Sequence, residues 1–201
     1  GALEAQGVPH ARCVGMIESV GITLPARAAA HSGLAVVVGA SEVTLLDLTN
    51  GYATLGRGGI RQRARLFPDE PAEPSRVLNP DVCASIDNIL SCRQRPPHGI
   101  EATALPWFMW KTGTSSGRRD AWAVGHNQRY AIGVWVGYFS GAGAPRLVGA
   151  QAAEPLLAAL FCTAPFRNEQ DPPPAERWVV RNPLPPPTEM ADDLRITMPA
   201  D

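Results

Sequence analysis

Lysine is almost absent from this chain. Its 201 residues include 17 arginines but a single lysine, Lys111. Because arginine fills nearly every other cationic position, the one retained lysine marks a place where a compact ammonium group is informative. The net charge is −1, so the chain lacks the basic excess typical of nucleic-acid-binding proteins. We therefore expect no nucleic-acid partner.

Long apolar runs and metal-binding patterns are missing as well. The longest apolar runs, "LAVVVGA" and "AIGVWVGYF", have the length of strands, well short of the ~20 residues that a membrane-spanning helix needs. The four cysteines form no C-x-x-C pair, and the four histidines are scattered, which argues against a zinc site. A Gly-rich phosphate loop is also lacking. We expect neither metal nor cofactor. Cys83 and Cys92 could pair in an oxidising compartment, although free or buried thiols are favoured.

Helices and strands can be placed from the hydrophobic pattern. "SEVTLLDLTNGYATLGRGG" predicts a helix with a capping box at Thr44 and Asp47, an apolar face, and a glycine stop. That face consists of Leu45, Leu48, Tyr52 and Leu55. "DVCASIDNILSC" predicts a short amphipathic helix. Three strand-like runs follow, at Leu105–Thr114, Ala121–Gly125 and Tyr130–Phe139, and the last two have hairpin spacing.

The third run is apolar on both of its faces, so helices should cover both sides of the sheet. Ala131, Gly133 and Gly137 would let one helix approach closely, and "VGAQAAEPLLAALF" supplies a helix directly afterwards. The pattern predicts an α+β fold with an antiparallel sheet. We expect a main domain over residues 1–166, a proline-rich linker over 167–191, and the first strand of another domain over 192–201.

The segment "KTGT" has the chemistry of a carboxylate-binding site. Lys111 supplies a positive charge, and the hydroxyls of Thr112 and Thr114 can donate hydrogen bonds to the same anion. Gly113 has no Cβ, so a substrate backbone can lie directly against the strand. An edge strand can also donate a backbone N–H to a developing oxyanion. The alternative is a solvated lysine beside a turn.

The same stretch fits a second motif. Residues 113–117, "GTSSG", match G-x-S-x-G, the nucleophile elbow of α/β-hydrolases. That elbow needs a strand, a sharp turn and then a helix. Here another strand-like run follows, and the nearest partners, Asp120 and His126, fall within the same hairpin. We therefore interpret this match as accidental.

The longer context resembles a known family. "WKTGTSSGRRDAWAVGHNQRYAIGVWVG" closely resembles the transpeptidase domain of class A penicillin-binding proteins, in particular the 1C type. "GASEVTLLDLTNGYATLGRGG" is similar to that family's helix before a Gly-rich stop, and "AAEPLLAALF" to its closing helix. "LRITMPAD" is similar to the opening strand of an extra C-terminal β-domain. The resemblance covers nearly all of the chain.

The resemblance implies a five-stranded antiparallel sheet with helices on both sides, and residues 1–166 as the C-terminal part of the transpeptidase domain. It implies acyl transfer from a peptidoglycan stem ending in D-Ala-D-Ala to an active serine, which β-lactams also acylate. Lys111 would contribute charge, Thr112 and Thr114 would contact the substrate carboxylate, and the Thr114 N–H would form half of the oxyanion hole. The implied location is periplasmic, with membrane attachment only through a segment N-terminal to this chain.

The family's S-x-x-K motif cannot lie in this chain, because Phe108 stands three residues before the only lysine. We expect the active serine to precede it. The position of the S-x-N motif, before Val8-Pro9, reads Ala5-Gln6-Gly7. This departure motivates an alternative, a degenerate homologue that binds cell-wall peptide or a partner protein. A stand-alone β-lactamase or carboxypeptidase is disfavoured by the proline linker and the trailing strand.

Overall fold

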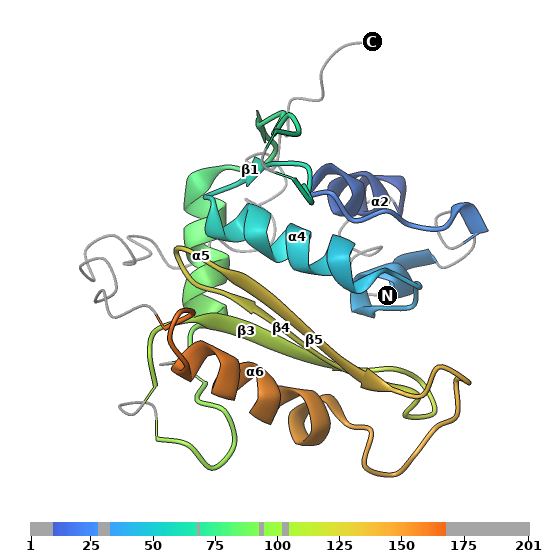
Figure 1. Ribbon diagram of the computed structural model, residues 1–201. Helices are drawn as coiled ribbons and strands as arrows, with labels where there is room; N and C mark the ends of the chain where they lie inside the picture. The colour runs from blue at the N-terminus through green and yellow to red at the C-terminus, as the bar shows by residue number, and fades with distance from the viewer. Residues whose placement is uncertain (1–9, 28–32, 68, 93–94, 102–104, 168–201) are drawn as a thin grey trace, which may run out of the picture.

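The fold has three layers, with helices on both faces of an antiparallel sheet (Figure 1). The computed structural model describes residues 10–27, 33–67, 69–92, 95–101 and 105–167. The predicted linker and the start of a further domain lie outside the described residues, as does Ala5-Gln6-Gly7. The predicted α+β architecture is confirmed.

The central sheet has the order β3-β4-β5, with β3 at Met109–Thr114, β4 at Asp120–His126 and β5 at Ala131–Gly137. Both pairs are antiparallel, and the register joins Gly113 to Trp122 and Trp122 to Trp135. All three predicted strands are present. The described residues thus contain three of the five strands that the resemblance implies.

The first strand begins later than predicted, at Met109 rather than Leu105. Residues 105–108 are buried but pair with no strand; instead the Cys92 N–H donates to the Phe108 carbonyl. Their side chains therefore join the core without joining the ladder. Phe108 stacks on Phe161 with ring centroids 4.5 Å apart.

Helix α4, Leu45–Gly56, lies across one face of the sheet (Figure 1). The Thr44 side chain accepts a hydrogen bond from the Asp47 N–H at 3.0 Å, as the capping pattern predicts. The helix approaches β5 closely at Gly133, where a Cβ would overlap Thr49 Oγ1 and lie 2.9 Å from Leu45 Cδ1. The predicted close approach of a helix to the small residues of β5 is confirmed.

The predicted apolar face of α4 is only partly right. Leu48, Tyr52 and Leu55 are half-buried, but Leu45 is exposed, and the buried residues are Gly51 and Thr54. Gly51 packs against Ile22, and the Thr54 hydroxyl donates to the Val20 carbonyl. The helix is thus contacted by the N-terminal segment as well as by the sheet. Because of this second contact, its buried side differs from the predicted apolar face.

The N-terminal part of the described chain packs beside α4. It contains α2 at His10–Ser19 and η1, a 3-10 helix at Gly33–Val38. The strand-length reading of "LAVVVGA" is therefore wrong. The buried Val36 packs in a small cluster with Val14 and Leu24, while Val38 is 86% exposed. Among the side chains described in η1, only Val36 is buried, which suits a helical segment with one side packed against its neighbours better than a strand covered on both faces.

The opposite face carries the main core. A π-helical turn, η3 at Gly149–Ala153, runs directly into α6 at Glu154–Cys162, which confirms the predicted helix after the third strand. Leu157, Ala158 and Phe161 of α6 are buried against Ala121 and Ala123 of β4. Ile132, Val134 and Val136 of β5 pack on the same cluster.

Helix α5, Pro80–Leu90, closes one end of the sheet. Its Asp87 Oδ1 lies 3.1 Å from Nε2 of His126, the last residue of β4, and both side chains are buried. The two atoms are close enough for an ion pair but are not aligned for a hydrogen bond. The segment before α5 contains a two-residue ladder of β1, Ile60–Arg61, with β2, Ser75–Arg76.

None of the four cysteines, all of which lie among the described residues, forms a disulfide. Cys83 and Cys92, the pair considered for a disulfide, are both buried. Burial raises the pKa of the Cys83 thiol to about 11, with a further contribution from the Asp87 carboxylate. The favoured interpretation, buried thiols, agrees with the structure.

The close approach of α4 to β5 gives a test of the packing. We expect Gly133→Ala to lower the free energy of unfolding by about 1–3 kcal/mol, because the added Cβ overpacks the contact with Thr49 and Leu45. The matched control is Gly113→Ala in the same sheet, whose Cβ would meet only Trp122 Cβ at an ordinary 3.6 Å. Urea unfolding of both variants measures the difference; equal midpoints would contradict the overpacking.

Candidate active site

The four residues of the K-T-G-T segment lie along the open edge of the sheet. Within the described residues β3 pairs with β4 on one side only, and on its other side the isolated bridge to Ser91 reaches no further than Met109. The segment from Lys111 to Thr114 therefore has an edge free for a ligand.

Because successive residues of a strand face opposite sides of the sheet, the four residues are divided between two faces. Lys111 and Gly113 share the face covered by α4, because Lys111 pairs with Val124 and Val124 with the Gly133 that lies beneath that helix. Thr112 and Thr114 share the face of η3, where Thr114 Oγ1 accepts a hydrogen bond from the Gly149 N–H at 2.9 Å. A ligand could meet all four side chains only by lying along the rim between the two faces.

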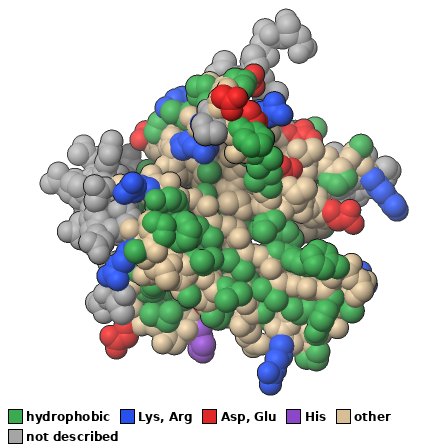
Figure 2. All heavy atoms as spheres, viewed as in Figure 1, with side chains coloured by type: hydrophobic (Ala, Val, Ile, Leu, Met, Phe, Trp, Pro, Cys, Tyr) green, Lys and Arg blue, Asp and Glu red, His purple; other side chains and the backbone are tan. Residues whose placement is uncertain are grey.

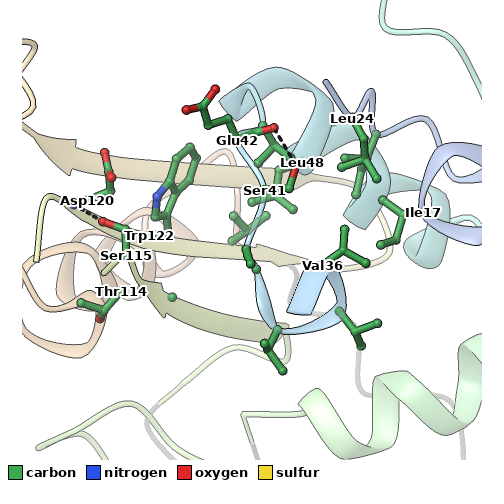
Figure 3. A pocket seen from close by; sticks show the side chains of 18 of the residues that line it. Ile17, Leu24, Val36, Ser41, Glu42, Leu48, Thr114, Ser115, Asp120 and Trp122 are labelled. Atoms are coloured by element: carbon green, nitrogen blue, oxygen red, sulfur yellow. Dashed lines mark hydrogen bonds between the residues drawn. The ribbon is translucent and has the colours of Figure 1, made fainter. Parts of the chain in front are cut away.

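All four residues line one cleft of about 1240 Å³. Its walls are α2, η1 and α4 on one side and β3 and β4 on the other. Figure 3 shows Thr114, Ser115, Asp120 and Trp122 at one end of it, and the apolar Ile17, Leu24 and Val36 at the other. The cleft thus runs from a polar mouth at the β3–β4 turn to an apolar interior.

Lys111 is one of two cations near this mouth, since Arg119 also lines the cleft. The Lys111 side chain is exposed, and its Nζ donates a hydrogen bond to the Thr112 carbonyl at 2.6 Å. In the part of the chain that the structure describes, no carboxylate is in ion-pair contact with Lys111. The ammonium group is therefore available to an incoming anion.

The backbone of β3 also presents donors to the open edge. The Ser115 N–H donates to the Asp120 carbonyl at 3.0 Å. Because alternate residues of an antiparallel pair point their N–H groups toward the partner strand, the Thr114 N–H points away from β4. An outward N–H one residue from an open glycine is the arrangement that an oxyanion site requires.

The elbow interpretation of "GTSSG" is excluded by the fold. The segment is the turn between antiparallel β3 and β4, with no helix after it. Ser115 Oγ accepts the Asp120 N–H at 2.9 Å, and His126 is at the far end of β4, six residues or about 20 Å away at strand rise. Ser115 thus has a structural role in the hairpin, and none of the described histidines hydrogen-bonds to it.

Three residues near the mouth were not predicted as site residues. Trp122 lines the cleft behind Gly113, and its ring makes an edge contact with Trp135, with centroids 6.5 Å apart. The Trp135 indole N–H donates to Asp120 Oδ1 at 2.9 Å. The alternation of β4 and β5 placed both tryptophans on one face, but which face carries the cleft could not be read from the sequence.

Tyr52 of α4 also lines the cleft. Burial raises its pKa to about 12, and the positive charge of Arg95 lowers it slightly. The phenol is therefore protonated at neutral pH and can act as a hydrogen-bond donor but not as a base. Within the described residues no group of His, Cys, Asp and Glu side chains could hold a metal ion.

Comparison with known proteins identifies the family. No family model matches the chain. Penicillin-binding protein 1C of Escherichia coli (strain K12) is 34% identical over 158 residues, which are 77% of this chain and 20% of that protein. The chain belongs to the penicillin-binding proteins.

Solved penicillin-binding proteins share the fold. PonA1 of Mycobacterium tuberculosis superposes with a TM-score of 0.59 at 20% identity, over 78% of this chain and 50% of that one. PonA1 in complex with penicillin V gives a TM-score of 0.61 at 18% identity, over 83% and 53%. The chain therefore spans about a fifth of the curated relative and about half of the solved chains. None of the described helices has the length and hydropathy to cross a membrane.

The apolar cleft of this penicillin-binding protein chain has a physical consequence. Figure 2 shows hydrophobic side chains over the middle and lower part of one face, with charged groups mostly at its margin. An apolar cleft open to water favours association, so we expect the isolated 201-residue chain to self-associate and to melt broadly. Light scattering after gel filtration, together with a thermal melt, measures both; a monodisperse monomer with a sharp cooperative melt would contradict this expectation.

Proposed function

We propose that the chain forms the K-T-G-T side of the acyl-transfer site in a peptidoglycan D,D-transpeptidase, with the nucleophilic serine supplied from outside the chain. The observation that carries the proposal is the open edge of β3. There a free ammonium, a bare glycine, two threonines and an outward N–H line one cleft, in a chain 34% identical to a penicillin-binding protein.

In the proposed reaction, the serine oxygen attacks the carbonyl carbon of the D-Ala-D-Ala peptide bond. The carbonyl oxygen becomes an oxyanion stabilised by the Thr114 N–H. The bond to nitrogen then breaks, the terminal D-Ala leaves with a proton on its amine, and an ester to the serine remains. An amine of a second stem attacks that ester, forms the cross-linking amide and returns the proton to the serine.

The positive charge at the edge of β3 would bind the substrate carboxylate. In the proposed complex it lies between Lys111 and the hydroxyls of Thr112 and Thr114, because charge-assisted hydrogen bonds are the strongest that these groups can offer. A β-lactam carries a carboxylate beside its strained amide and would acylate the same serine. PonA1, which has this fold, has been solved in complex with penicillin V.

The cleft supports the view that another segment completes the site. Neither Ser115, which is engaged in the hairpin, nor a residue three before Lys111 can serve as the nucleophile. The apolar interior between α4 and β4 has the lining that the apolar side of a helix would cover. We infer that a helix carrying the serine packs there.

The remaining partners follow from the same proposal. The substrate class would place the protein at the periplasmic side of the cell membrane, attached only through a segment N-terminal to the chain. The alternative of a degenerate homologue rests on Ala5-Gln6-Gly7, which lies outside the described residues. Nothing in the described part of the chain favours it.

Penicillin labelling tests where the nucleophile lies. We expect the isolated 201-residue chain to carry no covalent fluorescent penicillin after denaturing gel electrophoresis, whereas the full-length protein encoded by the same gene is labelled. Boiling the full-length protein before labelling is the control for nonspecific attachment. A labelled isolated chain would show that its own residues contain the nucleophile.

The role of Lys111 can be measured in the full-length protein. We expect Lys111→Met to lower the second-order rate constant for penicillin acylation about 10²-fold, because it removes a charge from the site while keeping a similar shape. Lys111→Arg should lose less, since it keeps the charge. Arg129→Met, an exposed cation on the loop after β4, is the control. Unchanged acylation in Lys111→Met would refute the proposed site.

A further inference from the structure

Gly149 lies directly behind the K-T-G-T strand. It is the first residue of η3 and is buried. A Cβ built on it would be 2.5 Å from the Gly113 carbonyl oxygen, 2.8 Å from the Trp122 carbonyl oxygen and 3.0 Å from Thr112 Cβ. Two of these three neighbours are backbone atoms that cannot rotate away. A residue with a Cβ would fit here only if η3 and the β3–β4 ladder moved apart.

The same glycine makes a polar contact with the site. Its N–H donates to Thr114 Oγ1 at 2.9 Å, while Thr114 itself is exposed and lines the cleft. A threonine hydroxyl has one proton and two acceptor lone pairs. Because Gly149 occupies one lone pair from behind the strand, the Thr114 hydroxyl is fixed in position and its proton remains to be donated.

The helical turn that carries this N–H is unusual. Gly149–Ala153 is π-helical and runs into α6, which has a proline in its first turn. Single π-helical turns inside helices are rare and often occur at functional sites. The wider turn places Gly149 against β3, whereas the rest of the helix packs on β4 and β5.

We propose that Gly149 is a positioning residue for carboxylate recognition, acting through Thr114. The missing side chain lets η3 lie close enough to β3 for the Gly149 N–H to reach Thr114 Oγ1, and that hydrogen bond orients the Thr114 hydroxyl so that it donates to the ligand carboxylate. The inference rests on the proposed acyl-transfer site and adds to it a residue outside the K-T-G-T segment. Gly149 itself does not touch the ligand.

A purely structural role for Gly149 makes a different prediction. If the glycine only fills space, Gly149→Ala should slow acylation by every β-lactam to a similar extent and independently of Thr114. If it acts through the Thr114 hydroxyl, the loss should depend on the ligand's carboxylate and should vanish once that hydroxyl is gone. A double-mutant cycle separates the two cases.

The experiment uses the full-length protein with four variants, Gly149→Ala, Thr114→Val, Thr114→Ser and the double variant Gly149→Ala/Thr114→Val. Gly15→Ala in α2, where a Cβ would meet nothing within 4 Å, controls for glycine replacement as such. Acylation rate constants are measured with penicillin V and with its methyl ester, which lacks the free carboxylate. Thermal midpoints are recorded for each variant.

We expect Thr114→Val and Gly149→Ala each to slow acylation by penicillin V about tenfold or more, the scale of a hydrogen bond to a charged group. With the methyl ester, each of these variants should react nearly as fast as the original protein does. Thr114→Ser should retain most of the rate with penicillin V. The double variant should be no slower than the slower single variant. Additive losses, or equal losses with acid and ester, would overturn the inference.

Two further observations keep the test decisive. If Gly149→Ala does not fold, hydrogen exchange at the Gly149 amide replaces it: exchange should accelerate in Thr114→Val and return to the original rate in Thr114→Ser, and unchanged exchange would overturn the inference. Failure of this inference is distinguishable from failure of the proposed function, because Lys111→Met tests the latter without involving Gly149.

Discussion

The structure depends on a steric constraint at the sheet, where backbone or side-chain atoms of neighbouring elements lie too close to leave room for a Cβ. On one face α4 packs onto β5 at Gly133, and on the other η3 packs onto β3 at Gly149. At Gly125 of β4 a Cβ would be 2.5 Å from the Met109 carbonyl oxygen. Because close-packed interiors tolerate little added volume, these glycines set the spacing of the three layers, and the depth of β3 relative to its neighbours follows from that spacing.

The candidate site uses a part of the sheet that, among the described residues, this packing leaves uncovered. The edge of β3 beyond Met109 pairs with no described strand, and α4 covers β4 and β5 more than β3. Lys111 is therefore exposed although the two residues before it are buried. The first residues of β3 are therefore buried in the core, whereas the following residues are exposed at the candidate site. The buried part of the strand holds the binding groups in place at the accessible edge.

In the proposed function, the chemistry of the site is divided between this chain and a segment outside it. The described residues offer charge, hydroxyl donors and an outward N–H, whereas the nucleophile of the proposed reaction and its immediate proton acceptor are supplied elsewhere. The cleft between α4 and the sheet explains how the two parts would meet, since its apolar interior has the lining of a helix-packing surface. The cysteine thiols and the buried His126–Asp87 pair do not line this cleft and contribute to the scaffold.

The sequence by itself determined the elements and the family. Short apolar runs with hairpin spacing identified three strands, and the Thr44 cap and the glycine stop placed α4, because local hydrogen bonding and side-chain periodicity are encoded over a few residues. The motifs around Lys111 were specific enough to predict a penicillin-binding protein by resemblance. Only the tertiary structure decided which side of α4 is buried and that most of "LAVVVGA" forms a 3-10 helix. It also decided that Ser115 accepts a hydrogen bond within the hairpin and that Gly149 lies behind Thr114. These outcomes depend on contacts between segments distant in the chain, and a pattern within one segment does not specify the surface against which it will pack.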